Sequence, residues 1–362
     1  MWAPSLGILI LLLLLRVTSV KAQFYTVASV SNIDRFNQES VFPVLKSKKH
    51  QSAADRINTY LHLTVLDQVY ENDRYAYFEH VFPPEDEYWG QSNFDFQVMT
   101  NNELFFSIAI MYESTGAYTE SFVEYYTFSS FTGEHLTLND FFAETPLIDV
   151  SSIVKDRFEK RIKSYLPQID KKEEDGDAKY EMYEECLSYI ESEDVLYNAS
   201  FYIKDTSMVF TRERCSNHMM AALDDLWTFE TALTLNELGL FFNEKTSNAL
   251  AKNYWESNGD VILNDKILKG SIRKKYKITA RIQFRPMKDG CQELSGVYWY
   301  DKIKTIITLN GEVDEDGNFE LIEYFDGVAT GVFKGKMKAN SLIGFWSSGK
   351  GTKKLPFILD LK

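Results

Sequence analysis

The chain has 362 residues, enough for two domains with hydrophobic cores, and its 44% hydrophobic and 25% charged residues are typical of a globular protein. Its formal net charge of −14 at pH 7 argues against nucleic acid as a partner, because phosphates require a basic face. The 26 Phe and 21 Tyr favour β-rich structure, since flat rings pack well on pleated surfaces.

Residues 1–22 have the features of a signal peptide. The apolar run Leu6–Leu15 is too short to span a bilayer comfortably, and Val20 and Ala22 are small residues where a signal peptidase cleaves. No later stretch is apolar enough to cross a membrane. The sequence therefore predicts a secreted or periplasmic protein; a retained N-terminal anchor is the alternative.

Charge divides unevenly over the remaining chain. Residues 23–254 hold 39 Asp and Glu against 19 Lys and Arg, whereas residues 255–362 hold 14 against 18. We therefore expect an acidic domain over 23–254 and a second domain over 255–362. The acidic surface would attract a basic protein or cations by long-range steering, although it would equally serve solubility alone.

In the first domain, the pattern predicts an α+β fold with an antiparallel sheet and packed helices. A helix beginning at Ser52 is indicated by apolar residues at three- and four-residue steps, and Asn139 or Asp140 can cap a short helix. An acidic loop at 75–88 matches no known cation-binding pattern. Strands are expected at 24–30, 41–46, 94–100, 104–114, 121–129 and within 199–213, and further helices at 146–166, 180–191 and within 232–242.

The second domain has short alternating strands at spacings of eight to twelve residues, which predict an antiparallel meander. Eight such strands commonly close into a barrel, and an open curved sheet is the alternative. Tyr298, Trp299 and Trp346 are candidates for the lumen, where they would fill the barrel at least as readily as they would bind a ligand. The expected strands are 266–272, 276–284, 293–300, 305–313, 318–324, 327–337, 342–347 and 354–361.

The sequence shows no catalytic motif. It has no GxSxG, HExxH, P-loop or GxGxxG pattern, and its five His are scattered. Cys186 and Cys215 are disulfide candidates in an exported protein, with Cys291 left reduced; the alternative is that neither thiol is paired. A glycosylation sequon begins at Asn198. We predict a non-enzymatic protein without metal or cofactor.

Several tracts between 41 and 242 resemble one known family. They include VFPVL near Val41, the stretch from Asn93 to Tyr118, and TGEHLTLNDFF, which is similar to the family's TGK-x-LTL-x-DLF. The family is the extracellular domain of RsiV-type anti-sigma factors, shared with an accessory region of PdaC-type peptidoglycan deacetylases. The residues that carry the motif are Gly116, Thr132, Gly133, Leu136, Leu138, Asp140 and Phe142.

The resemblance implies an α+β domain outside the cytoplasmic membrane that binds lysozyme in the anti-sigma relatives. Lysozyme is basic, so an acidic domain is a suitable counterpart. The sigma-binding segment and the deacetylase catalytic domain have no counterpart in this sequence. We expect an exported binding protein of the bacterial cell envelope, for a basic protein such as lysozyme or for peptidoglycan. The alternatives are a small-ligand carrier that uses the barrel and a hydrolase of envelope polysaccharides.

Overall fold

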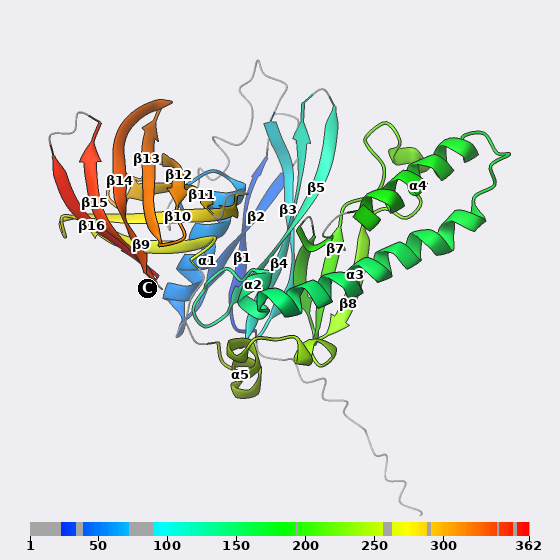
Figure 1. Ribbon diagram of the computed structural model, residues 1–362, viewed down its shortest axis with the longest axis horizontal. Coiled ribbons are helices and arrows are strands. Elements are labelled where there is room, and N and C mark those ends of the chain that lie inside the picture. Colours follow the sequence, from blue (N-terminus) through cyan, green and yellow to red (C-terminus); the bar gives the residue numbers. More distant parts are fainter. Residues whose placement is uncertain are drawn as a thin grey trace, which may run out of the picture.

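The computed structural model describes residues 23–33, 39–71, 90–116, 118–192, 195–197, 199–255, 263–287, 291–338, 340–349 and 353–361. The expected signal peptide, the acidic loop at 75–88 and the sequon asparagine lie outside this described part. An α+β region precedes a closed eight-stranded antiparallel barrel, which confirms the predicted fold class (Figure 1). No helix among the described residues has the length and apolarity to span a bilayer.

Three antiparallel sheets form the framework of the α+β region. The middle strand of the second sheet is the apolar run expected from the sequence, and Phe105 to Ile110 are all buried. The sheets are β1 (Thr26–Ile33) with β2 (Glu39–Lys46), then β3 (Gly90–Asn101), β4 (Phe105–Thr115) and β5 (Thr119–Ser129), and last β6 (Ser200–Lys204), β7 (Ser207–Arg212) and β8 (Phe229–Thr234).

One hydrophobic core lies between α1 (Gln51–Val65) and the first two sheets. The three- and four-residue spacing of Ala54, Ile57 and Leu61 places them on one helix face, where all three are fully buried. The helix begins at Gln51, one residue before the expected start at Ser52, and His50 occupies the N-cap position. This core also receives Ile267 and Trp299 from the barrel, so it joins the two parts of the molecule.

A second core lies beneath the long helix α3 (Glu144–Tyr165), which packs against β8, and α4 (Gly176–Ser192) packs against α3 (Figure 1). Just before α3, the short helix α2 (Leu138–Phe141) begins with a capping box in which Thr137 is the N-cap and Asp140 accepts from its backbone N–H. Asp140 therefore supports the cap from the third helical position, and neither it nor Asn139 is the cap itself.

The prediction of a helix within 232–242 is wrong. β8 continues to Thr234 with a strict alternation of buried and exposed residues, and only a short 3-10 turn, Glu237–Leu240, follows. An alternating face and two threonines favour a strand over a helix. The helix α5 (Glu244–Lys252), which the sequence reading did not single out, comes next and is capped by the Asn243 side chain.

The eight expected barrel strands are all present, with ends within two residues of the expected ones. The last strand pairs with the first, as in Phe357 opposite Ile272, so the barrel is closed and the open-sheet alternative is excluded. Gly270 permits this closure, because a Cβ there would lie 1.8 Å from the carbonyl oxygen of Ile358. The strands are β9 (Lys266–Ile272), β10 (Tyr276–Pro286), β11 (Gln292–Tyr300), β12 (Ile307–Val313), β13 (Asn318–Phe325), β14 (Val328–Lys338), β15 (Ser341–Ser348) and β16 (Lys354–Asp360).

Candidate binding groove beside a disulfide

A disulfide joins α4 to the segment that follows β7. Cys186 lies on the helix, Cys215 lies three residues beyond the strand, and their Cα atoms are 5.5 Å apart. This is the pairing predicted from the sequence. Cys291, the third cysteine, is half-buried just before β11 in the barrel.

The periodicity of α4 decides which of its side chains face the disulfide. Met182, Tyr183 and Ile190 are buried against the second core. Because neighbouring positions on a helix point in different directions, this packing leaves Glu181 and Glu185 at the surface, one turn apart. Both carboxylates line the same groove as Cys186.

A groove of about 560 Å³ runs between α4 and the segment after β7. Glu181 and Glu185 form its acidic wall, and Arg212 and Arg214 stand on the opposite wall. None of its lining residues is a His, Ser or Thr. The lining comprises Ala178, Glu181, Met182, Glu185, Cys186, Tyr189, Arg212, Arg214, Cys215, Asn217 and Met220.

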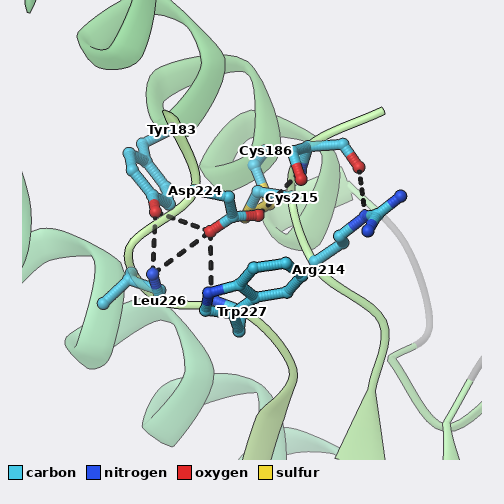
Figure 2. The surroundings of a disulfide bond; sticks show 8 residues. Tyr183, Cys186, Arg214, Cys215, Asp224, Leu226 and Trp227 are labelled. Atoms are coloured by element: carbon cyan, nitrogen blue, oxygen red, sulfur yellow. Dashed lines mark hydrogen bonds between the residues drawn. A yellow bond between two sulfur atoms is a disulfide. The ribbon is translucent and has the colours of Figure 1, made fainter. Parts of the chain in front are cut away.

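Asp224 holds the segment after β7 against α4 (Figure 2). Its carboxylate is 2% exposed and accepts hydrogen bonds from the Tyr183 hydroxyl at 2.6 Å and from the backbone N–H of Ser216 and Trp227, both at 3.0 Å. Burial, and then this bond to Asp224, raises the pKa of Tyr183. The disulfide and this buried carboxylate together fix the second wall of the groove.

Large aromatic side chains stand exposed around the groove. Trp227 is 56% exposed and lies 5.8 Å from the Arg214 guanidinium, and Tyr189 is 54% exposed with the Arg212 guanidinium 5.3 Å from its ring. Arg214 also forms an ion pair at 2.7 Å with Glu120 of β5. Trp, Tyr and Arg are the residue types enriched at the energetic centres of protein–protein interfaces.

Most of the motif residues form turns or core positions of the α+β region and do not line the groove. Gly133 has a φ of +71°, and a Cβ there would lie 2.3 Å from the carbonyl oxygen of Ala53, so the turn with Thr132 needs glycine where it meets α1. Leu136 and Phe142 are buried in the second core, and Leu138 packs at its edge.

One motif turn does approach the groove. Gly116 lies in the turn between β4 and β5, and Tyr118 beyond it stacks on His218 with ring centroids 4.1 Å apart. His218 belongs to the segment that carries Cys215. The β4–β5 turn therefore borders the groove wall, a proximity that the sequence alone does not reveal.

Asp140 connects the motif to the barrel. Lys266, the first residue of β9, is fully buried and its ammonium lies 2.6 Å from the Asp140 carboxylate. It also donates to the carbonyl oxygen of His135. A buried charge requires a partner, and Asp140 supplies one 126 residues earlier in the sequence.

Asp265 forms a second ionic contact at this junction. Its carboxylate accepts a hydrogen bond of 2.6 Å from the Tyr60 hydroxyl and forms an ion pair of 2.6 Å with the Arg281 guanidinium. Nδ1 of His135 lies 3.0 Å from the same carboxylate. Burial opposes ionisation of Asp265, but His135, Arg281 and Tyr60 together hold its pKa below the usual range. Burial also disfavours the charged form of His135, and because that form is the protonated one, burial lowers the pKa of His135. The sequence reading missed these residues because their partners are distant in the chain.

The lumen assignment needs a correction. Tyr298 and Trp346 belong to the barrel core, but Trp299 points outward and packs in the first core of the α+β region. Successive strand residues face opposite sides, so Tyr298 and Trp299 cannot both line the lumen. Ring contacts fill the interior, with Tyr298 5.3 Å from Phe333 and Phe333 4.9 Å from Phe357.

Comparisons with known proteins show a weak likeness to a solved structure. No family model and no curated protein matches the chain. Among solved structures, a member of the DUF3298 family from Bacteroides fragilis aligns with a TM-score of 0.42 and 10% sequence identity, covering 64% of this chain and 97% of that chain. A likeness at this level assigns neither a family nor a function.

Among the described residues, no group of three or more His, Cys, Asp or Glu side chains is arranged to hold a metal ion. The groove thus offers carboxylates, guanidinium groups and exposed rings as contact groups. This set of side chains suits the docking of a partner surface.

Proposed function

We propose that the chain is an exported, non-enzymatic binding protein of the cell envelope, and that the groove beside the disulfide docks a basic protein of the lysozyme class. The observation that carries this proposal is the groove itself: a fixed concavity with a carboxylate wall on α4 and exposed aromatic side chains around it. Concave sites with aromatic anchors are where binding energy concentrates.

The charge around the groove suits a basic partner. From Asp170 to Ser192, the turn before α4 and the helix itself hold nine Asp and Glu against three Lys. The arginines opposite are partly engaged within the chain, since Arg214 pairs with Glu120. A surface of this kind raises the association rate of a cationic protein and weakens in salt.

The sequence resemblance to RsiV-type domains supports the same partner, because those relatives bind lysozyme. The carrier alternative finds no support, since aromatic side chains fill the barrel lumen where a small ligand would have to enter.

Titration calorimetry with egg-white lysozyme tests the proposal. The exported chain, residues 23–362, should bind at 20 mM salt and more weakly at 500 mM. Reversing the acidic wall with Glu181→Lys and Glu185→Lys should weaken binding at least about tenfold, roughly 1.4 kcal/mol.

The matched control reverses the same number of charges in the exposed β12–β13 turn, with Glu315→Lys and Asp316→Lys. Equal weakening by both double variants would show attraction to overall charge without a groove. Failure of the unmodified chain to bind at low salt removes the lysozyme proposal. Cosedimentation with peptidoglycan in its place would identify wall material as the ligand.

A further inference from the structure

Four of the turns that connect barrel strands lie at the same end of the barrel, because successive strands run in opposite directions. In an up-and-down barrel, the connections β9–β10, β11–β12, β13–β14 and β15–β16 all lie on the same side. We call the described residues 273–277, 301–304, 325–328 and 353–354 the basic end. The chain terminus after β16 and the Lys266 junction lie at the opposite end.

Charge is concentrated at the basic end. Eight Lys and Arg stand there against only Asp301 and Asp326, and within the described part of the chain none of the eight takes part in an ion pair. By contrast, the β12–β13 turn at the opposite end is Asp-Glu-Asp. The eight cationic residues are Arg273, Lys274, Lys275, Lys277, Lys302, Lys304, Lys353 and Lys354.

The same end exposes large apolar side chains between its cations. Ile303 is 66% exposed, Val328 64%, Phe325 49% and Tyr276 43%. They come from three different turns, so they do not result from one loop that failed to pack. Exposed apolar side chains grouped among polar residues mark an interaction surface.

Three cationic residues at this end occupy left-handed backbone positions. Arg273 and Lys274 have φ of 55° and 56°, and Lys304 has 65°. Left-handed turn positions favour Gly or Asn, and other residues there cost about 1 kcal/mol each. A sequence that breaks a local rule repeatedly on one surface indicates a function of that surface.

We propose that the basic end attaches the protein to an anionic lipid surface. The ammonium and guanidinium groups would contact headgroup phosphates, while Ile303, Val328 and Phe325 enter the boundary between headgroups and acyl chains. Charge complementarity requires an anionic partner, and the apolar tips select lipid, because a hydrated anionic polymer offers them no apolar environment. This attachment is independent of the groove beside the disulfide.

Vesicle sedimentation tests the attachment. The exported chain, residues 23–362, should cosediment with vesicles of phosphatidylcholine and phosphatidylglycerol at 3:1 and not with phosphatidylcholine alone. The triple variant Lys274→Glu, Lys275→Glu and Lys302→Glu should lose roughly a hundredfold in affinity, at about fivefold for each cation near the surface. The double variant Ile303→Ser and Val328→Ser should also bind more weakly.

The matched control reverses three exposed barrel lysines away from this end, Lys269→Glu, Lys336→Glu and Lys338→Glu, and should bind as the unmodified chain does. Thermal melts establish that all variants are folded. Equal loss in the control, or no binding to anionic vesicles, overturns the proposal. Unchanged binding of the Ile303 and Val328 variant, together with equal affinity for a soluble polyanion, would make this end a site for an anionic polymer and overturn the lipid assignment.

Discussion

His62 shows what burial does to a single ionisable residue. Its ring is fully buried, with Nδ1 2.8 Å from the carbonyl oxygen of Asn58 and the ring edge against Phe42. Burial lowers its pKa to about 4, although the bond to Asn58 acts in the opposite direction. The folded protein therefore keeps His62 neutral at a pH where the unfolded chain takes up a proton.

This difference predicts a pH dependence of stability. Between about pH 6.5 and pH 4 the unfolded state binds more protons, so the free energy of unfolding should fall as the pH falls, by about 3 kcal/mol from this residue. Urea denaturation at half-unit pH steps measures the slope. The variant His62→Gln should flatten it, and a slope as steep as that of the unmodified chain would assign the effect to other groups.

At the scale of elements, the disulfide holds α4 against the segment after β7. Closing a loop with a sequence separation of 29 contributes roughly 3–4 kcal/mol in the chain-entropy model. The double variant Cys186→Ser and Cys215→Ser should lose about that much in urea denaturation. It should also lose affinity for lysozyme, since one groove wall is then held by Asp224 without the cross-link.

The variant Cys291→Ser serves as the comparison, because it leaves the cross-link in place. If the double variant unfolds within about 1 kcal/mol of the unmodified chain, then the noncovalent contacts alone define the groove.

The elements also show where sequence reading succeeds. Barrel strands were predicted to within two residues because alternation of period two is a local signal, and the disulfide followed from cysteine count and expected export. The prediction that Trp299 lines the lumen is wrong, because side-chain type does not tell which face of a strand points inward. The end of β8 was misread because LTLNELGLFF mixes both periods over ten residues.

The groove and the ionic junction could not be read from the sequence for a different reason. Arg214 meets Glu120, and Lys266 meets Asp140, across 94 and 126 residues. No local pattern encodes such pairs, because the fold must exist before the partners are neighbours. The Cys186–Cys215 pair is the one part of the groove that the sequence predicts.

At the scale of the whole molecule, the two proposed surfaces lie far apart. α3 and α4 extend away from the sheets on one side, and the barrel lies on the other (Figure 1). The acidic α4 wall and the basic end of the barrel carry opposite charge, so separation keeps them from neutralising each other. A protein held at a lipid surface by one would present the other to a cationic partner.

The junction between barrel and α+β region is what maintains this arrangement. Removing the Lys266 ammonium by Lys266→Met leaves the Asp140 carboxylate buried without its cation, which should cost about 3–5 kcal/mol. The exposed neighbour on the same strand, changed by Lys269→Met, should shift the free energy of unfolding by no more than about 0.5 kcal/mol. Equilibrium urea denaturation of both variants measures the difference; equal, small effects would mean that the pair contributes little.

Closure of the barrel also constrains the order in which the chain can complete its fold during synthesis. Asp360 pairs with Lys269, so the first barrel strand stays open along one edge until β16 has been made. The α+β region has by then left the ribosome and can fold as a unit. Any chain cut short within the barrel keeps two unpaired strand edges, which are templates for aggregation.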